Sequence, residues 1–259
     1  MSDSLILDRI SQNLARLHLF RIPGVLPGLL KAAEEVSQSH LGFLDALLEE
    51  EVAQKEQRRV ETCLKISGLP FIRTIDDYDF LFQPKLDRQK VLNLFDLTFI
   101  GRHENVLFLG PPGVGKTHLA VALAVKAAQT GFSIYFTSMD DLLVKLREDV
   151  GKKGKSKARC HYKSALVIVD EVGYTPVSRE DCNLFYRFVA QRYEKTSTVI
   201  TSNKAFSDWT EFLHDQVIVT AILDRLLHHS VVVNIKGNSF RLRGKVPDQG
   251  KEDGEKNEF

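Results

Sequence analysis

Apolar residues recur every three or four positions through the first 70 residues, a spacing that predicts amphipathic helices. One apolar stripe consists of Ile6, Ile10, Leu14 and Leu17. A longer helix is expected over 42–66, because this segment follows Ser39 and stops before a Ser-Gly pair. Two proline–glycine pairs are expected to break the path between the helices: Pro23, Gly24, Pro27 and Gly28. The pattern predicts a small all-α domain over residues 1–70.

From residue 71 to residue 104 the chain is expected to form a linker and a helix. Residues 74–83 (TIDDYDFLFQ) mix aromatic and acidic side chains, and a helical pattern follows over 86–100. This segment leads into a second region with a different pattern.

From Asn105 onward, short apolar or β-branched runs alternate with helical segments. Strands are predicted at 105–110, 133–138, 165–170, 197–203 and 231–235. Helices are predicted at 116–129, 139–150, 179–194 and 208–229. Continuous apolar runs are typical of parallel strands that are buried on both faces. The predicted fold over 105–243 is therefore α/β, a five-stranded parallel sheet with helices on both faces, and 244–259 is predicted to be disordered.

Composition excludes several classes of protein. The 259 residues are 43% hydrophobic and 27% charged, as in ordinary soluble globular proteins. No apolar run approaches the roughly 20 residues of a membrane span, and residues 1–20 carry no secretory pattern. The three widely spaced cysteines indicate neither a disulfide framework nor a zinc site, so a cytoplasmic location is expected.

The adjacent pair His228 and His229 is interpreted as surface or interface groups. Neighbouring side chains on a helix point away from each other, and no cysteine or acid stands at ligand spacing. A metal site is therefore not expected here.

Charge is distributed unevenly. Residues 1–104 have a net charge of −3 and residues 105–259 have a net charge of +4. Within the second part, residues 145–163 carry eight basic and two acidic side chains. Such a local excess favours contact with the phosphate backbone of DNA, although a solvated surface gives the same pattern. The candidate DNA-binding residues are Lys152, Lys153, Lys155, Lys157 and Arg159.

Residues 105–117 (NVLFLGPPGVGKT) carry the strongest functional signal. An apolar strand leads to Gly110, and the spacing G-x-x-x-x-G-K-T places Lys116 and Thr117 at the start of a helix. Glycines let backbone N–H groups approach a phosphate, and the helix start adds unpaired N–H groups. Lys116 is expected to reach the β- and γ-phosphates and to act in catalysis. We predict ATP binding by Gly110, Pro111, Pro112, Gly113, Val114, Gly115, Lys116, Thr117, His118 and Asp170.

A second strand, LVIVDE, supplies the acids that ATP hydrolysis requires. Thr117 and Asp170 are predicted to hold Mg²⁺, and Glu171 is predicted to orient the attacking water or take its proton. Asn203, after the fourth strand, is a candidate contact to the γ-phosphate or to the attacking water, or alternatively a turn residue.

Arg225 lies near the end of the last predicted helix, far along the chain from the phosphate-binding loop. We expect it to act as a catalytic arginine finger on the nucleotide of a neighbouring copy, although pairing with Asp224 is an alternative. Arg241 and Arg243 are weaker candidates for contact with the γ-phosphate or with DNA.

Four segments together resemble the AAA+ ATPase family that includes IstB-like transposition helper proteins and DnaC-like helicase loaders. They are DFLFQPKLDRQKVLNL, GPPGVGKTHLAVALAVKA, IVDEVGYTPVS and LDRLLHHSVVVNIKGNSFRLR. The last two point towards the IstB-like branch. The resemblance implies an ATPase encoded beside an insertion-sequence transposase, which binds DNA, assembles with ATP and assists the transposase.

The same resemblance implies the roles of single residues. It assigns phosphate binding to Gly110, Gly113, Gly115, Lys116 and Thr117. It assigns the acidic pair to Asp170 and Glu171, the sensing amide to Asn203 and the finger to Arg225. Few residues follow the last predicted strand, so the full C-terminal helical lid of wider AAA+ proteins is not expected.

Three alternative functions remain open. The partner could be a replicative helicase, as for a loader, with the N-terminal helices docking on it. The loop could instead serve a small-molecule kinase, although kinases seldom need the acidic pair, a distal arginine and a basic patch. A nucleotide-gated scaffold that never hydrolyses ATP is the third.

Overall fold

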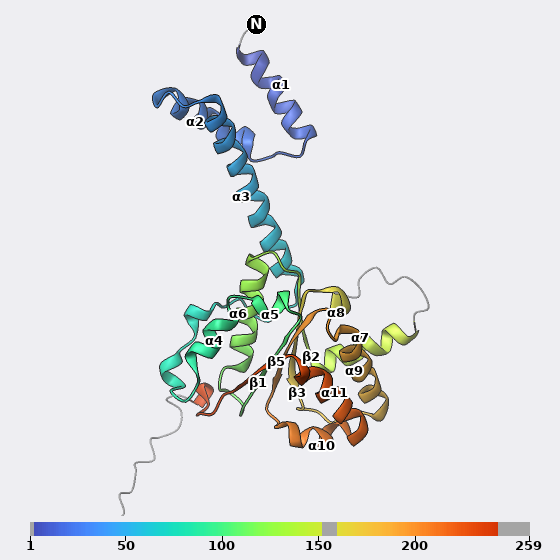
Figure 1. The fold of residues 1–259 in the computed structure, drawn as a ribbon. Coiled ribbons are helices and arrows are strands. Elements are labelled where there is room, and N and C mark those ends of the chain that lie inside the picture. Colours follow the sequence, from blue (N-terminus) through green and yellow to red (C-terminus); the bar gives the residue numbers. More distant parts are fainter. Residues whose placement is uncertain (1–2, 152–159, 243–259) are drawn as a thin grey trace, which may run out of the picture. The chain divides into compact units, whose positions relative to one another are not determined.

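The computed structural model describes residues 3–151 and 160–242. The predicted DNA-binding residues 152–159, the predicted tail 244–259 and Arg243 lie outside these ranges. The chain divides into two compact units, Met1–Cys63 and Leu64–Phe259. Figure 1 shows the labelled elements of both units.

The N-terminal unit consists of helices, as the apolar spacing predicts. They are α1 (Asp3–Arg16), α2 (Ile22–Glu35) and α3, which begins at His40 and continues to Ile66. The expected break at the proline–glycine pairs is wrong, because all four of these residues lie inside α2. Pro23 stands in the first turn, where its missing N–H would have had no acceptor, and burial of Ile22 and Leu26 supports the helix that continues through Pro27.

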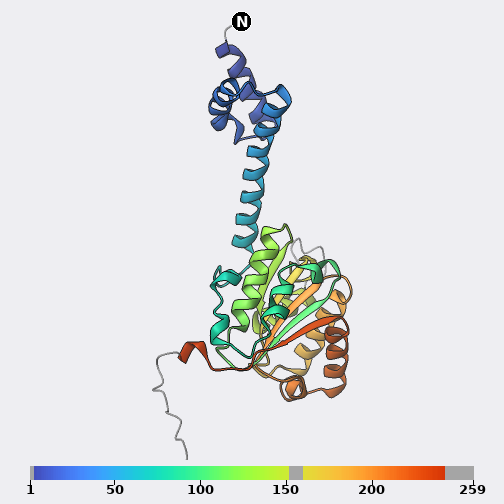
Figure 2. The same cartoon turned by 60° about the vertical axis from the view of Figure 1, so that its left-hand side comes forward.

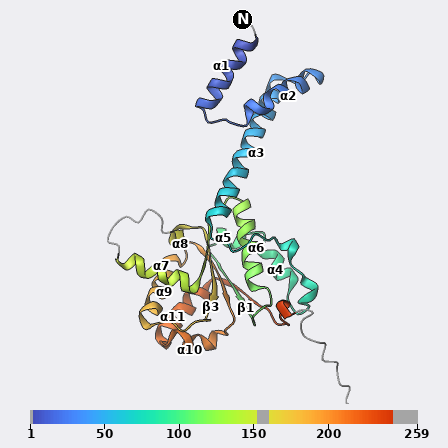
Figure 3. The same ribbon diagram turned by 180° about the vertical axis from the view of Figure 1, so that it is seen from behind.

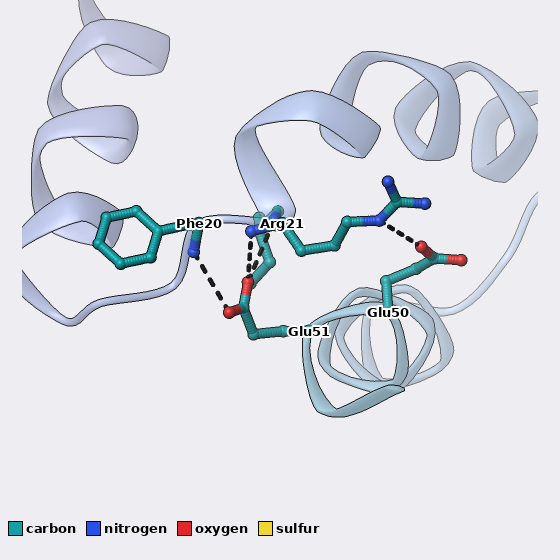
Figure 4. A network of polar contacts seen from close by, with 5 residues as sticks. Phe20, Arg21, Glu50 and Glu51 are labelled. Atoms are coloured by element: carbon teal, nitrogen blue, oxygen red, sulfur yellow. Dashed lines mark hydrogen bonds and ion pairs between the residues drawn. The ribbon is translucent and has the colours of Figure 1, made fainter. Parts of the chain in front are cut away.

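One buried carboxylate fastens the start of α2. Glu51 of α3 accepts hydrogen bonds from the backbone N–H groups of Phe20 (3.2 Å), Arg21 (2.8 Å) and Ile22 (3.2 Å). Figure 4 shows Glu51 beside Phe20 and Arg21. Burial raises the pKa of Glu51, but these hydrogen bonds outweigh that effect and hold the pKa below its ordinary value of 4.5. Glu51 therefore satisfies N–H groups that the helix itself leaves without partners.

The second unit is built on a five-stranded parallel sheet. Its strands are β1 (Asn105–Leu109), β2 (Ile134–Ser138), β3 (Leu166–Val172), β4 (Ser197–Ser202) and β5 (Ser230–Asn234). Their order is β2-β3-β4-β1-β5, and every neighbouring pair is parallel. This order brings the carboxyl ends of β1, β3 and β4 to one edge, where ligands of open α/β sheets bind.

Helices cover both faces of the sheet, as predicted (Figures 1 and 3). One side carries α6 (Lys116–Gln129), which Figure 2 shows along the strands, with α4 (Arg88–Leu94) nearby. The other side carries α7 (Met139–Gly151), α9 (Arg179–Arg192), α10 (Trp209–Leu213) and α11 (Gln216–His228). The apolar core on that side is built around Phe185, Phe188 and Trp209, all fully buried. The remaining helices are short: α5 (Thr98–Gly101), α8 (Cys160–Lys163), η1 (Ile75–Asp77), η2 (Phe80–Phe82), η3 (Phe206–Asp208) and η4 (Phe240–Leu242).

Two predicted helices are interrupted. The segment 86–100 contains α4 and α5, separated at Leu97, and the segment 208–229 contains α10 and α11, separated at His214. Both separating residues have φ of 57°, which a continuous right-handed helix does not allow. Asp215 then starts α11 by accepting hydrogen bonds from the N–H groups of Val217 and Ile218.

Across the described ranges 3–151 and 160–242, none of the helices has the length and apolar character that crossing a membrane demands.

We predict that Glu51→Gln destabilises the N-terminal unit. A net contribution of about 1–3 kcal/mol is expected to be lost, because hydrogen bonds to a charged acceptor are stronger than those to a neutral amide. Hydrogen exchange of amides 20–22 in the full chain measures this loss as faster exchange. Because the folded pKa of Glu51 is lowered, the stabilisation is present above the unfolded pKa and disappears as the pH falls through the folded value.

Glu50→Gln is the matched control. It makes the same charge change next in sequence, at an exposed carboxylate that pairs with the Arg21 side chain, and such pairs contribute little. Equal exchange rates in the two variants would contradict the role assigned to Glu51.

Candidate nucleotide-binding and catalytic site

The loop between β1 and α6 has the backbone that the glycines were predicted to provide. Gly113 and Gly115 have φ of 81° and 97°, in the left-handed region that favours glycine. At Gly115 a Cβ atom would lie 2.7 Å from the Tyr78 ring. The loop therefore requires glycine there both for its conformation and for the close approach of a neighbouring side chain.

Lys116 folds back over this loop. Its Nζ donates hydrogen bonds to the carbonyl oxygens of Gly110 (2.7 Å) and Pro111 (2.8 Å), and the side chain is buried. Burial lowers the pKa of Lys116, the positive charge of Arg241 lowers it further, and the nearby carboxylates oppose both effects. The amine is thus held at the loop that is expected to surround the phosphates.

A β-bulge positions the acidic pair. β3 and β4 pair with Val169 opposite Ile200, and pairing resumes with Val172 opposite Ser202, so β3 has one extra residue. Glu171 lies in this bulge with φ of 62°, a conformation uncommon for residues other than glycine. The bulge turns Glu171 into the cavity beside the phosphate-binding loop while leaving the Asp170 side chain buried.

Thr201 of β4 ties the two acids together. Its hydroxyl accepts a hydrogen bond from the Glu171 N–H (3.0 Å) and donates one to the Asp170 carboxylate. This fixes the backbone of the bulge from the opposite strand.

The two predicted Mg²⁺ ligands face each other. Thr117 Oγ1 lies 3.0 and 3.1 Å from the two carboxylate oxygens of Asp170. Oxygen donors of this kind, a hydroxyl and a carboxylate, are those that Mg²⁺ prefers, so the residues present fit the ion.

Residues before the core form a second wall of the site. The Tyr78 hydroxyl donates a hydrogen bond to the Val114 carbonyl (3.1 Å), and its ring meets the His118 ring edge to face. Burial raises the pKa of Tyr78 to about 12, which keeps the phenol protonated as a donor. His118 Nε2 lies 3.2 Å from the Thr74 carbonyl, and burial lowers the pKa of His118, so a neutral ring donates through Nε2. These contacts hold the linker against the loop.

The segment after β5 completes the wall. The backbone N–H of Phe240 donates to the Gly113 carbonyl (2.9 Å), and the Phe240 ring packs edge to face on Phe82. Arg241, the next residue, lines the cavity. Loop, linker and C-terminal segment enclose about 480 Å³, within the usual range of ligand sites.

Among the described residues that line this cavity, fixed positive and negative charges balance. The cations are Arg73, Lys116 and Arg241, and the carboxylates are those of Asp77, Asp79 and Glu171. The lining side chains thus supply no net positive charge for a triphosphate, although loop N–H groups and the start of α6 add favourable dipoles.

The structure brings most of the predicted site residues together. Glu171 and the run from Gly113 to His118 line the cavity. Asp170 accepts a hydrogen bond from Thr117, which lines the cavity. Gly110, Pro111 and Pro112 form the start of the loop, and the first two hold Lys116 with their carbonyl oxygens.

Asn203 and Arg225 do not line the cavity. Asn203 follows β4, and its Oδ1 is buried without a hydrogen-bond partner in the part of the chain that the structure describes. Arg225 lines a separate open surface of α11, where its Nη1 donates to the Ala221 carbonyl (2.9 Å) and its guanidinium lies over the Tyr186 ring.

Sequence reasoning did not assign the roles of Tyr78 and Thr201. Tyr78 belongs to the aromatic and acidic linker, whose composition gave no sign of contact with the loop. Thr201 stands two residues before Asn203 in β4, where Ser197, Thr198 and Ser202 are polar as well, so polarity alone did not distinguish it.

Comparison with known proteins identifies the family. A model of the IstB-like ATP-binding proteins matches residues 12–247. The chain belongs to this family. It is 41% identical over 239 residues to the ATP-binding protein of insertion sequence IS5376 from Geobacillus stearothermophilus, covering 92% of this chain and 95% of the relative. It is 43% identical over 238 residues to that of insertion sequence IS21 from Pseudomonas aeruginosa, covering 90% and 88%.

Solved structures share the fold. DnaI superposes with a TM-score of 0.53 at 20% identity, over 62% of this chain and 90% of DnaI. AMPPCP-bound DnaA from Aquifex aeolicus superposes with a TM-score of 0.54 at 19% identity, over 68% of this chain and 54% of DnaA. The predicted AAA+ α/β core, preceded by helices, is thereby confirmed.

We predict that Tyr78→Phe weakens ATP binding about fivefold, because one hydrogen bond that holds the linker against the loop, worth about 1 kcal/mol, is lost. Equilibrium binding of a fluorescent ATP analogue measures the change. Tyr135→Phe removes a hydroxyl that contacts Lys145 outside the cavity, and serves as the control. Unchanged affinity in Tyr78→Phe would show that this bond does not support the site.

Proposed function

We propose that this chain is a Mg²⁺-dependent ATPase that assembles with copies of itself on DNA and assists the transposase of an insertion sequence. The observation that carries the ATPase part is the meeting of the loop, Thr117–Asp170 and Glu171 at one cavity. The relatives supply the insertion-sequence context, because their names place them in such elements.

The proposed site residues have distinct tasks. Loop N–H groups and Lys116 bind the phosphates, and Thr117 with Asp170 holds Mg²⁺, which neutralises charge on the phosphates when bound. Glu171 orients water and takes its proton, while the hydrogen bond from its N–H to Thr201 fixes its backbone. Asn203 carries a buried Oδ1 that finds no hydrogen-bond partner among the described residues, which suits contact with the attacking water once the side chain reaches the cavity.

The balanced charge of the cavity favours completion of the site by a second copy. Charge that develops on the transferred phosphoryl group needs positive charge in excess of this balance, and an arginine supplied by a neighbour is worth about 10³–10⁵ in rate. Arg225 lies on an open surface of α11 rather than in the cavity lining, which suits such a role. ATP would then join subunits, and hydrolysis would release them.

DNA is the partner proposed for the basic cluster 145–163. Its ends lie in α7 and α8, and the five candidate residues between these helices are outside the described residues. The sequence contains no recognised base-reading motif such as a zinc finger, so contacts to backbone and DNA shape are proposed.

A helicase loader is the second candidate, since the DnaI structure shares the fold. At 20% identity this likeness concerns the fold alone. A pull-down that offers both a replicative helicase and the transposase of the adjacent gene separates the two candidates. DNA-stimulated phosphate release without a small-molecule acceptor separates both from a kinase and from a scaffold that does not hydrolyse ATP.

We predict that Glu171→Gln retains ATP binding but hydrolyses ATP about 10²–10⁴-fold more slowly, because the general base is lost. ATP-bound assemblies should then persist on DNA. Phosphate release, nucleotide binding and particle size are measured together.

Glu180→Gln makes the same charge change at an exposed position of α9 and is the control. Normal turnover by Glu171→Gln would remove Glu171 from the role proposed for it.

We predict that replacing the cluster lysines with alanine weakens DNA binding and flattens its dependence on salt. The variant changes Lys152, Lys153, Lys155 and Lys157. Each lost phosphate contact should reduce the slope of log K against log salt by about 0.9 on duplex DNA. The control removes the same charge from exposed lysines elsewhere, namely Lys85, Lys90, Lys126 and Lys195. Equal slopes for the two variants would show that the cluster is a solvated surface that does not contact DNA.

A further inference from the structure

The histidine pair after Arg225 has a geometry that the sequence argument did not foresee. α11 ends at His228, and His229 adopts a non-helical conformation with φ of −126° and ψ of 89°. The premise that both side chains follow helical directions is therefore wrong. Their ring centroids lie 4.0 Å apart, so the two imidazoles lie on the same side of the chain.

A carboxylate from another element joins them. Glu194 follows α9 in a turn with φ of 56°, and the N–H of the next residue donates to the Arg192 carbonyl (3.0 Å). Glu194 Oε1 lies 3.8 Å from His228 Nδ1 and 3.7 Å from His229 Nε2. All three potential ligand atoms lie within 4.8 Å of one another.

We propose that Glu194, His228 and His229 form a surface site for a borderline divalent transition metal such as Zn²⁺. Imidazole nitrogen and carboxylate oxygen bind Zn²⁺ at about 2.0–2.2 Å, which places tetrahedral ligand atoms about 3.3 Å apart. The two observed distances to Glu194 are slightly longer than this spacing. Small rotations of the exposed side chains would bring the ligand atoms to it. Solvent completes the coordination, because all three groups are exposed.

The surroundings of the cluster are compatible with a metal. The carbonyl of His229 accepts a hydrogen bond from the Asn105 N–H (2.8 Å), so the backbone of one ligand is anchored to β1. The Tyr193 hydroxyl lies 2.7 Å from His228 Nδ1, and a metal would displace it from that nitrogen. Glu194 offers the displaced hydroxyl another acceptor, so that the phenol becomes an outer partner of a ligand.

A metal at this cluster would affect Arg225, an inference that rests on the proposed function. His228 follows Arg225 by three residues and lies one helical turn beyond it. A bound metal adds positive charge there and fixes the last turn of α11, so metal occupancy would alter the way Arg225 meets a neighbouring copy.

Titration of the full chain with Co²⁺ and Zn²⁺ tests the site, in buffer that contains excess Mg²⁺ and no nucleotide. Visible absorption of Co²⁺ and calorimetry of Zn²⁺ binding are the readouts. One equivalent of metal should bind, with a Co²⁺ spectrum of nitrogen and oxygen ligands and no thiolate band. The Mg²⁺ keeps the Thr117–Asp170 pair from contributing.

The double variant His228→Ala, His229→Ala should lose this equivalent, and Glu194→Gln should weaken it by at least about tenfold, the lower end for loss even of an outer partner. His214→Ala, at an exposed histidine outside the cluster, should bind as the unmodified chain does. Circular dichroism confirms that each variant is folded. Arg225→Ala should retain metal binding even where it abolishes assembly, which separates failure of this proposal from failure of the proposed function.

The proposal is overturned if the unmodified chain binds neither metal. It is also overturned if the double variant binds as tightly as the control, because the contact among these side chains is then an ordinary ionic one between imidazolium and carboxylate.

Discussion

The balance of charge in the nucleotide cavity is the constraint on which this account depends. Three cations and three carboxylates line the cavity among the described residues, and a triphosphate adds negative charge to that balance. Binding is still supported by the loop, where left-handed glycines expose N–H groups and α6 begins. The proposed hydrolysis adds a further demand, because charge shifts during phosphoryl transfer and preorganised cations must stabilise it. We propose that Mg²⁺ and an arginine from outside the cavity provide this positive charge.

The strand order places the groups proposed for phosphate binding and for hydrolysis at the same edge of the sheet. The phosphate-binding loop follows β1, and the acidic pair lies at the bulge of β3. Thr201 of the neighbouring strand β4 accepts a hydrogen bond from the backbone of that bulge. Linker and C-terminal segment then pack on the loop through Tyr78 and Phe240. These segments come from opposite ends of the unit, so we expect nucleotide binding to depend on their packing as well as on the loop.

Much of this could be predicted from sequence where a local pattern dictates structure. The run GPPGVGKT determines its own backbone, and the continuous apolar runs locate all five strands within two residues at each end. The order of the strands could not be predicted, since it depends on contacts between distant segments. The left-handed conformation of Glu171 could not be predicted either, because it depends on the pairing between β3 and β4.

Local rules failed where tertiary contacts outweighed them. Proline–glycine pairs suggested a break, yet burial of Ile22 and the carboxylate of Glu51 sustain α2. The histidine pair was judged by helical geometry, yet the helix ends between the two residues. Glu51 lies 29 positions from Ile22, and the acid that joins the histidines, Glu194, is also distant in sequence, so neither contact is visible in a local pattern.

Mixing two impaired variants tests the shared site most directly. Arg225→Ala keeps the loop and Glu171, while Glu171→Gln keeps Arg225, and each alone should hydrolyse ATP slowly. When they are mixed in equal amounts, random assembly gives intact interfaces at about one in four positions, so hydrolysis should recover to about a quarter of the unmodified rate. A mixture that stays at the sum of its two components, or full activity of Arg225→Ala alone, would contradict completion of the site by a neighbouring copy.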